Sequence, residues 1–521
     1  MQGSTRIVLG NVGCNVAKKI GIIDLGSNSV RLVIFEIKST GAYKLIDDIN
    51  DTIRLSENMV EGKYINDIAM HKAVKTVKLY KKLCSAYGIS SSGIIAVATE
   101  AVRKAENKDQ FLSLLRTGSG LVFRILSGKE ECTYVYNAVI NSIEVSNGII
   151  VDIGGGSTEI IQFKDKMIKN SISIPIGAVT ATESFLDKNS ITAAMLENLQ
   201  KSVLETLNSL DWLTGEAHKV IIGVGGTIRT LAKIHRIQTK YPLNQAHNYV
   251  MDEDDFQSVY NTLKDLNLQT RKKVMGNSAA RADIIVGGLA ILKAIMAASS
   301  SPKLIVSGYG LREGILLEYI FKTKNARRFE DILNFSLSNF IDLYGMRQEH
   351  ANHVCHLALS MYDQLRELHG FGEEERKLLK IASLLHDIGI SINYYDHHKH
   401  SFHLILNSRI NGLSHRELVL VSAIAASHSR DDFRENWRSH YKMLLQPDDE
   451  IVYQILSLFL KISECLDRSE MGIVKSLDCQ VYNNSVKIQT IREGDAELEL
   501  NLANEYGTIF KRFFGKLLSI T

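Results

Sequence analysis

Two aspartates stand where apolar runs end and polar turns begin. Asp24 closes the run of residues 20–24, and Asp152 closes the run of residues 149–152. Hard dications such as Mg²⁺ prefer carboxylate oxygens, keep several waters and bridge to phosphate. Turn capping is the common alternative use of an aspartate at such a position. The pair predicts a divalent-metal site, with Glu159 as a further candidate for holding metal or water.

The turns that follow these runs have the composition of a phosphate-binding site. Glycines allow several backbone N–H groups to converge on an anion, because no side chain blocks the approach. One glycine turn alone is as easily a plain hairpin. Four of them, two directly after a strand-terminal Asp and the last at residues 307–310, favour phosphate. The candidate phosphate-binding residues are Asp24, Gly26, Ser27, Asn28 and Ser29, then Gly154, Gly155, Gly156, Ser157 and Thr158, and then Gly225, Gly226 and Thr227.

Two arginines are candidates for clamping a phosphate. Arg103 stands where a strand-like run becomes a helix, and Arg281 opens another helix. A guanidinium can bind a phosphate in bidentate fashion. A solvated surface position is the alternative for each arginine taken alone.

A pair of glutamates opens a helix and could supply a general base. Cleaving a phosphoanhydride with water needs a group that positions the water and accepts its proton. Adjacent helix residues point about 100° apart, so only one of Glu130 and Glu131 can face a cleft. Glu131 shares the face of the apolar residues Val135 and Ala138. We therefore expect Glu131 to be the base, although first-turn glutamates also stabilise a helix dipole.

Beyond about Phe329 the strand-like runs give way to amphipathic helical periodicity, rich in His and Asp. Imidazole and carboxylate groups together can hold a metal ion. His397, His398 and His400 are crowded, and the sequence does not tell which one points inward. The alternative is a domain that has lost its metal and only extends a polyanion groove. The candidate ligands are His353, His386, Asp387, His398, His428 and Asp467.

Length and composition bound the elements that must position these residues. A chain of 521 residues is too long for one ordinary core, so we expect at least three domains. A net charge of +3 argues against a nucleic-acid coat protein. The six cysteines form no CxxC pair, which fits a reducing compartment. Neither a signal-peptide core nor a membrane-spanning run is visible, so we expect a cytoplasmic location with no membrane partner.

Repetition of the strand–turn–strand unit predicts two related α/β lobes with a helical region after them. The expected divisions are residues 1–19 as an N-terminal extension, 20–143 as lobe I, 144–325 as lobe II, 326–478 as a helical domain and 479–521 as a small α+β cap.

With these residues in view, the chain resembles the exopolyphosphatase / guanosine pentaphosphate phosphohydrolase family. The matching motifs span both lobes, and the actin and sugar-kinase proteins that share the general fold lack this set. They are Ile23–Ser29, Thr99–Arg103, Ser127–Glu131, Asp152–Glu159, Gly225–Thr227 and Ser307–Gly314.

The resemblance implies two actin-like, ribonuclease-H-like (ASKHA) lobes, release of terminal phosphate that depends on Mg²⁺ or Mn²⁺, and a homodimer. Carried over to this chain, it implies that Glu131 is the base and that Asp152 and Glu159 bind metal and phosphate. Family members act on inorganic polyphosphate, on guanosine pentaphosphate, or on both. The helical region resembles the HD phosphohydrolase fold, which implies a possible second divalent metal.

Two other functional classes stay open. An actin-fold kinase or ATPase would transfer phosphate from a nucleotide to an acceptor. A non-catalytic sensor would bind polyphosphate or an alarmone without cleaving it.

Overall fold

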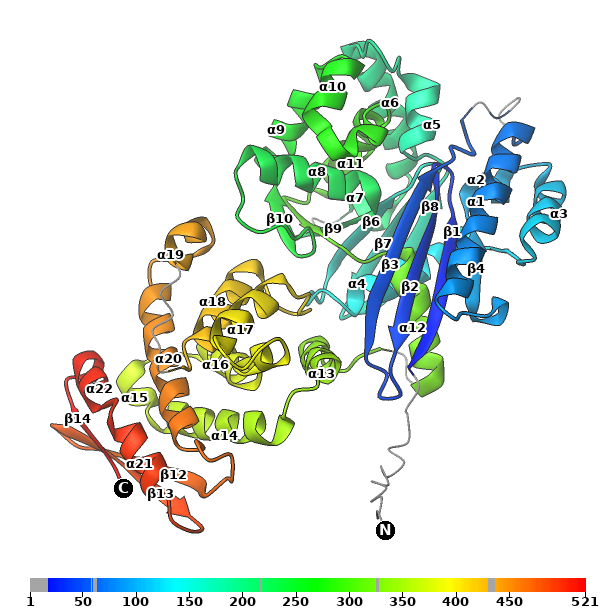
Figure 1. Ribbon diagram of the computed structural model, residues 1–521. Coiled ribbons are helices and arrows are strands. Elements are labelled where there is room, and N and C mark those ends of the chain that lie inside the picture. The colour runs from blue at the N-terminus through cyan, green and yellow to red at the C-terminus, as the bar shows by residue number, and fades with distance from the viewer. Residues whose placement is uncertain (1–16, 58, 60–62, 216–217, 325–327, 430–435) are drawn as a thin grey trace, which may run out of the picture. The chain divides into compact units, whose positions relative to one another are not determined.

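The computed structural model describes residues 17–57, 59, 63–215, 218–324, 328–429 and 436–521 (Figure 1). Residues 1–16 of the predicted extension lie outside this range, and Lys18 already belongs to the first strand. The chain forms two compact units. The N-terminal unit comprises Met1–Asn141, Val145–Ile234 and Val250–Arg328, and the C-terminal unit comprises Ser142–Glu144, His235–Tyr249 and Phe329–Thr521.

The first lobe of the N-terminal unit is built on a five-stranded sheet of order β3-β2-β1-β4-β5. Strand β1 pairs antiparallel with β2 and parallel with β4. Helices α1 to α3 cover one face of this sheet (Figure 1). The elements are β1 (Lys18–Leu25), β2 (Ser29–Ile37), β3 (Tyr43–Thr52), α1 (Asp67–Ala86), β4 (Ile94–Ala98), α2 (Glu100–Lys104), α3 (Lys108–Ser119), β5 (Arg124–Ile125) and α4 (Gly128–Ile140).

The second lobe repeats this plan around a six-stranded sheet of order β10-β11-β9-β6-β7-β8. Strand β6 pairs antiparallel with β7 and parallel with β9, as β1 does with β2 and β4. The strands are β6 (Gly148–Ile153), β7 (Thr158–Lys164), β8 (Met167–Ile174), β9 (Ile221–Val224), β10 (Tyr249–Asp252) and β11 (Lys303–Val306). The helices are α5 (Ala178–Phe185), α6 (Ala193–Leu207), α7 (Asp211–Thr214), α8 (Gly225–Gln238), α9 (Glu253–Lys264), α10 (Leu268–Met275), α11 (Ile285–Ser299) and α12 (Leu311–Lys324).

Burial on both faces explains the apolar character of the central strands. Ile22 and Ile23 point to opposite faces of β1, and both are fully buried. Ile22 packs with Leu316 and Ile320 of α12, while Ile23 packs under α1. Helix α12 follows the last strand of lobe II in sequence, yet its apolar side belongs to the core of lobe I. The segment expected to form lobe II, residues 144–325, therefore includes a helix whose apolar side packs in the core of lobe I.

The C-terminal unit combines a helical bundle with a small sheet. Strand β12 starts at Val474, so the region expected to be all helical up to residue 478 ends in a strand. The three-stranded sheet has the order β12-β13-β14. The helices of the bundle are α13 (Ile332–Tyr344), α14 (Gln348–Gln364), α15 (Arg366–His369), α16 (Glu373–Leu385), α17 (His397–Asn407), α18 (His415–Ala426), α19 (Trp437–His440) and α20 (Asp449–Cys465). The last elements are β12 (Val474–Val481), β13 (Ser485–Arg492), α21 (Glu497–Asn504), α22 (Gly507–Phe514) and β14 (Leu517–Ile520).

Across the described part of the chain, no helix is both long enough and apolar enough to cross a membrane.

Candidate active site

A cavity of about 170 Å³ lies in the N-terminal unit, where the turns after β1 and β6 meet the start of α8. Most of the residues that the sequence predicts for the site line it: Asp24, Gly26, Ser27, Asn28, Ser29, Glu131, Asp152, Gly154, Gly155, Gly156, Ser157, Glu159, Gly225, Gly226 and Arg281. Segments far apart in the sequence therefore form one wall, as the repeat predicts.

The two turns have the same backbone bond. Gly26 N–H donates to Ser29 O over 3.0 Å, and Gly154 N–H donates to Ser157 O over 3.0 Å. The carbonyls of Asn28 and Gly155 accept bonds from backbone outside the cavity lining. A trans peptide places the next N–H on the side opposite its C=O. The N–H groups that follow these two carbonyls therefore face away from those backbone partners, and Ser29 and Gly156, which carry them, both line the cavity.

Close approach explains two of the glycines. A Cβ on Gly156 would lie 2.6 Å from the Oγ of Ser27, so a larger residue there would displace the Ser27 side chain or separate the two turns. Gly225 has φ +91°, which favours glycine, and a Cβ there would lie 2.5 Å from the Oδ1 of Asp152. Glycine at these positions lets the three loops share one small cavity.

Asp152 and Glu159 are direct cross-strand neighbours on β6 and β7. Like charges at such positions destabilise a sheet. Burial raises the pKa of Asp152 to about 6, and burial together with the charges of Glu131 and Asp152 raises that of Glu159 well above its usual value. The hydroxyls of Ser157 and Ser173 donate to Glu159 over 2.8 and 2.7 Å. The arrangement leaves two buried carboxylates in need of positive charge.

Glu130 and Glu131 point in different directions, as the helix-face argument expects. Glu130 completes a capping box with Ser127, and its side chain is 43% exposed. Glu131 is buried and lines the cavity. Burial raises the pKa of Glu131 to about 7, with the Arg103 guanidinium opposing the shift. A carboxyl group with this pKa can exchange a proton near neutral pH.

Arg103 does not line the cavity itself, and its role as a phosphate clamp stays a prediction. Its guanidinium is engaged by the carboxylates of Glu131 and Glu100. Thr158 and Thr227 also lie outside the lining. The Thr158 hydroxyl donates to Ile176 O over 2.7 Å, and the Thr227 side chain packs at Gly288. The contacts of these three side chains are with other residues of the N-terminal unit, and none of the three lines the cavity.

Three arginines that line the cavity, Arg31, Arg229 and Arg312, were not predicted from the sequence. Burial and the neighbouring guanidiniums of Arg312 and Arg31 lower the pKa of Arg229 to about 10. Burial likewise lowers the pKa of Arg281. Crowded, buried cations favour a multiply charged anion. One signal was available, because Arg31 stands seven residues after Asp24, as Glu159 does after Asp152.

The cleft carboxylates fit a hard dication. Asp24 and Asp152 are buried, and burial raises the pKa of both. Among the described residues, the groups that bring three ligand atoms within 4.8 Å of one another lie elsewhere, in the C-terminal unit. Mg²⁺ is usually held by one or two carboxylates, waters and substrate phosphates, so a complete protein cage is not expected.

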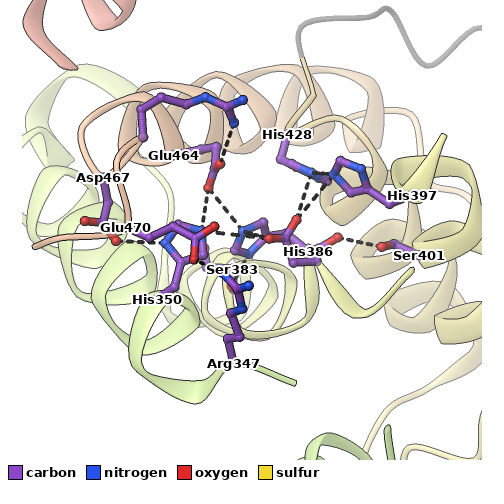
Figure 2. Close-up of polar contacts among 12 residues, drawn as sticks. Arg347, His350, Ser383, His386, His397, Ser401, His428, Glu464, Asp467 and Glu470 are labelled. Atoms are coloured by element: carbon purple, nitrogen blue, oxygen red, sulfur yellow. Dashed lines mark hydrogen bonds and ion pairs between the residues drawn. The ribbon is translucent and has the colours of Figure 1, made fainter. Parts of the chain in front are cut away.

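Figure 2 shows a second cluster of His and acidic side chains, in the C-terminal unit. Of the predicted ligands it contains His386, Asp387 and His428. His353 instead has its Nε2 2.8 Å from Val474 O, and His350, one helical turn earlier on α14, takes the inward position.

His397 rather than its neighbour His398 joins the cluster. Asp467 accepts from Nδ1 of His350 over 2.8 Å and so lies behind the ligand atoms, while Glu464, one turn earlier on the chain, faces them. The sequence predicted that these segments are helical. It did not show which residue of each helix points into the cluster.

Comparison with known proteins agrees with this architecture. Residues 33–323 match the Ppx/GppA phosphatase family, and residues 332–507 match domain III of Ppx/GppA phosphatases. A guanosine-5'-triphosphate,3'-diphosphate pyrophosphatase from Pseudoalteromonas translucida is 27% identical over 424 residues, which are 79% of this chain and 80% of that protein.

Solved structures give the same result. The Aquifex aeolicus family member is 29% identical and aligns with a TM-score of 0.51 over 59% of this chain and 99% of its own. An exopolyphosphatase from Cytophaga hutchinsonii, 22% identical, has the same fold with a TM-score of 0.55 over 60% of this chain and 99% of its own. The chain is a hydrolase with actin-like lobes and belongs to the Ppx/GppA phosphatase family.

Proposed function

We propose that the cavity between the two turns hydrolyses the terminal phosphoanhydride of inorganic polyphosphate, of guanosine pentaphosphate, or of both. The observation that carries the proposal is the buried carboxyl of Glu131, with a pKa raised to about 7, in a cavity also lined by four arginines and two glycine turns. Relatives named for pyrophosphatase and exopolyphosphatase activity support the same reaction class.

The negative charge of the polyanion would neutralise the arginines that line the cavity. Arg31, Arg229, Arg281 and Arg312 line the cavity, and Arg312 is 3.9 Å from Asp24. Their guanidiniums and the N–H groups of the turns would hold the terminal phosphate. Charge that develops on the transferred phosphoryl group is stabilised by such fixed donors.

Glu131 is placed to act on water. Its ionised carboxylate would accept the proton of the attacking water, whose oxygen bonds to the terminal phosphorus while the bridging oxygen leaves with its electron pair. The Arg103 guanidinium pairs with this carboxylate. Protonation of Glu131 would stop the reaction, so activity should be lost as pH falls through the pKa of this group.

Asp24, Asp152 and Glu159 would hold Mg²⁺ or Mn²⁺. The fit rests on buried carboxylates whose raised pKa values mark a shortage of positive charge. When bound, the dication supplies charge that offsets the phosphoryl oxygens.

The first experiment measures orthophosphate release from long-chain polyphosphate and from guanosine pentaphosphate in parallel. Glu131→Gln should lower turnover about 10²–10⁴-fold, because the amide keeps the shape and cannot accept a proton. Substrate binding should survive.

Glu130→Gln is the matched control, since glutamine can also complete the capping box. Equal loss in both variants would refute Glu131 as the base. Formation of ADP from ATP with an added acceptor, without orthophosphate release, would replace the proposal by a kinase. Tight binding of both substrates by the wild type without cleavage would replace it by a sensor.

A further inference from the structure

Residues 53–57, which follow β3, hold the turn between β1 and β2 by its backbone. The N–H groups of Ile53 and Arg54 both donate to the carbonyl of Asn28, over 3.0 and 2.8 Å. A further N–H of this segment donates to the carbonyl of Ser27 over 3.2 Å. Both carbonyls belong to residues that line the cavity. The position of the β1–β2 turn therefore depends on residues 53–57.

The same segment contacts lobe II through two ion pairs. Nη1 of Arg54 lies 2.8 Å from Oδ2 of Asp283. Oε1 of Glu57 lies 2.8 Å from Nζ of Lys188. The Asp283 side chain is only 9% exposed, whereas that of Lys188 is 34% exposed. The pair between Arg54 and Asp283 is therefore the one that solvent screens less.

Arg54 has an unusual backbone conformation. Its φ is +59°, in a region that residues with a Cβ rarely adopt and that glycine adopts freely. Such conformations persist where the surrounding structure fixes them, and they concentrate at functional sites. Glycine would fit this backbone more easily but would lose the ion pair. Arg54 thus connects the β1–β2 turn, through its backbone, to Asp283 of lobe II, through its side chain.

Asp283 belongs to the short segment that carries Arg281. Arg281 lines the cavity, and its guanidinium lies against the start of α8, where a Cβ on Gly226 would overlap it. The carbonyl of Ala282 accepts a hydrogen bond over 2.8 Å from Nη1 of Arg271, which is fully buried. Burial lowers the pKa of Arg281, and the charge of Asp283 opposes that shift. The segment is thus fixed from within lobe II by a buried arginine and from lobe I by an ion pair.

We propose that Arg54 and Asp283 are positioning residues for the terminal phosphate. Their ion pair sets the distance between the β1–β2 turn of lobe I and the Arg281 guanidinium of lobe II, so that both bind the same phosphate group. Neither residue of the pair lines the cavity, so both act through the groups that they hold. Donors that are in place before a charged group arrives bind it with less reorganisation. The inference rests on the proposed function, because it takes a terminal phosphate as the ligand of this cavity.

Binding of tripolyphosphate is the first test, by isothermal titration calorimetry on the full chain with saturating Mg²⁺. The Glu131→Gln variant serves as the parent, since it should bind the probe without turnover. Asp283→Asn, nearly isosteric, removes one charge of the pair and should raise Kd about tenfold, because Arg281 is no longer held against the phosphate. An unchanged Kd would overturn the inference, and so would a parent that does not bind the probe.

A double-mutant cycle separates positioning from a general loss of structure. In a protein that already carries Arg281→Gln, Asp283→Asn should change Kd by less than about twofold, because no guanidinium is left to position. If Asp283→Asn had the same effect with and without Arg281, it would act on the fold as a whole, and the inference would be wrong.

Arg54 offers a rescue and the interface a control. One nitrogen, Nη1, reaches both Asp283 and Glu57, so a lysine ammonium can take its place. Arg54→Gln should raise Kd as far as Asp283→Asn does, whereas Arg54→Lys should stay within about threefold of the parent. Lys188→Gln removes the other ion pair between the lobes and should leave Kd unchanged. An equal rise in Lys188→Gln would assign the effect to lobe contact in general and refute the role of this pair.

Steady-state kinetics without the Glu131→Gln change distinguish this inference from the proposed function. Asp283→Asn should raise KM for polyphosphate about tenfold and keep kcat within about threefold of the wild type. An active wild type whose KM is unchanged by Asp283→Asn would refute the inference and leave the proposed function standing. A wild type that releases no orthophosphate would refute the proposed function, and the binding measurements would still decide whether the pair positions the phosphate.

Discussion

The two hairpins that meet at the cavity share one backbone plan and carry opposite chemistry. In each, a strand-terminal Asp precedes a turn closed by the same glycine-to-serine hydrogen bond. The cross-strand partner of Asp24 is Arg31, whereas the cross-strand partner of Asp152 is Glu159. One hairpin thus places a cation opposite its aspartate, and the other places a second carboxylate there. An internal repeat can therefore preserve backbone geometry while the two halves carry side chains of different charge, which is the arrangement we propose for an anion on one side and a cation on the other.

The surroundings of the two aspartates sharpen this contrast. Burial raises the pKa of both aspartates, and arginines oppose the rise in each: Arg312 and Arg31 at Asp24, and Arg229 and Arg312 at Asp152. The difference lies in the cross-strand partner, which is a cation for Asp24 and the buried carboxylate of Glu159 for Asp152. We therefore expect the β6–β7 hairpin to be the half that depends on metal.

The largest effect should come from Asp152→Asn compared with Asp24→Asn. Loss of a carboxylate that holds the cation removes several kcal/mol of transition-state stabilisation, about 10²-fold or more in turnover. The Asp24→Asn variant should lose less, because Asp24 faces the cation Arg31 across the two strands, whereas Asp152 faces a second carboxylate, Glu159. Titrating orthophosphate release with Mg²⁺ should show a raised metal requirement for Asp152→Asn. Equal metal dependence of the two variants would remove the distinction between the hairpins.

A smaller effect concerns the base that faces both hairpins. Arg103 lowers the pKa of Glu131, so Arg103→Gln should raise that pKa by about one to three units. The base works only when ionised, so the acidic limb of the pH–rate profile should move to higher pH by the same amount. Lys104→Gln is the control, since Lys104 pairs with Glu100 at 2.7 Å and does not contact Glu131. An unmoved acidic limb in Arg103→Gln would mean that another group limits the rate.

The sequence was sufficient for the parts of the site that are local in the chain. A strand-terminal Asp and a glycine turn are contiguous, so Asp24, Asp152 and their loops could be named without a structure. Glu131 could be separated from Glu130 because apolar residues on the same helix marked the buried face.

The sequence did not show which face of a helix is buried where no apolar residues mark that face. It also did not show which residues of distant segments contact one another. His350 and His353 lie one turn apart on α14, and only packing against α20 selects His350. Arg103 has the type of a phosphate clamp, but the carboxylates that engage it come from two different segments. The HD-like fold of the C-terminal unit, the cytoplasmic location and the homodimer stay predictions.

Arg31→Gln should affect binding of substrate more than turnover. The residue lines the cavity and is the β1–β2 counterpart of Glu159. A hydrogen bond to a charged group contributes about 1.5–3 kcal/mol, but three other arginines remain and Asp48 already accepts a bond from Arg31 Nε over 2.6 Å. We expect KM for polyphosphate to rise about tenfold, with kcat within about threefold of wild type. A large loss of kcat at unchanged KM would place Arg31 in the chemical step.

The smallest effect should follow from removing the ion-pair partner of Arg31, Asp48, while Arg31 itself is kept. Asp48 on β3 pairs with Arg31, and the two side chains are 30% and 27% exposed. Ion pairs this accessible to solvent contribute about 0–1 kcal/mol, so Asp48→Asn should change the free energy of unfolding by less than about 1 kcal/mol. The freed guanidinium would add positive charge to the anion-binding side, so KM for polyphosphate should fall slightly, and the decrease should disappear at high salt because screening weakens exposed charges. Combining Asp48→Asn with Arg31→Gln tests the cause, since Asp48→Asn should no longer lower KM when the guanidinium is absent. If the decrease in KM persisted in the double variant, Asp48 would be repelling the substrate directly, and Arg31 would not be the anion-binding counterpart of Glu159.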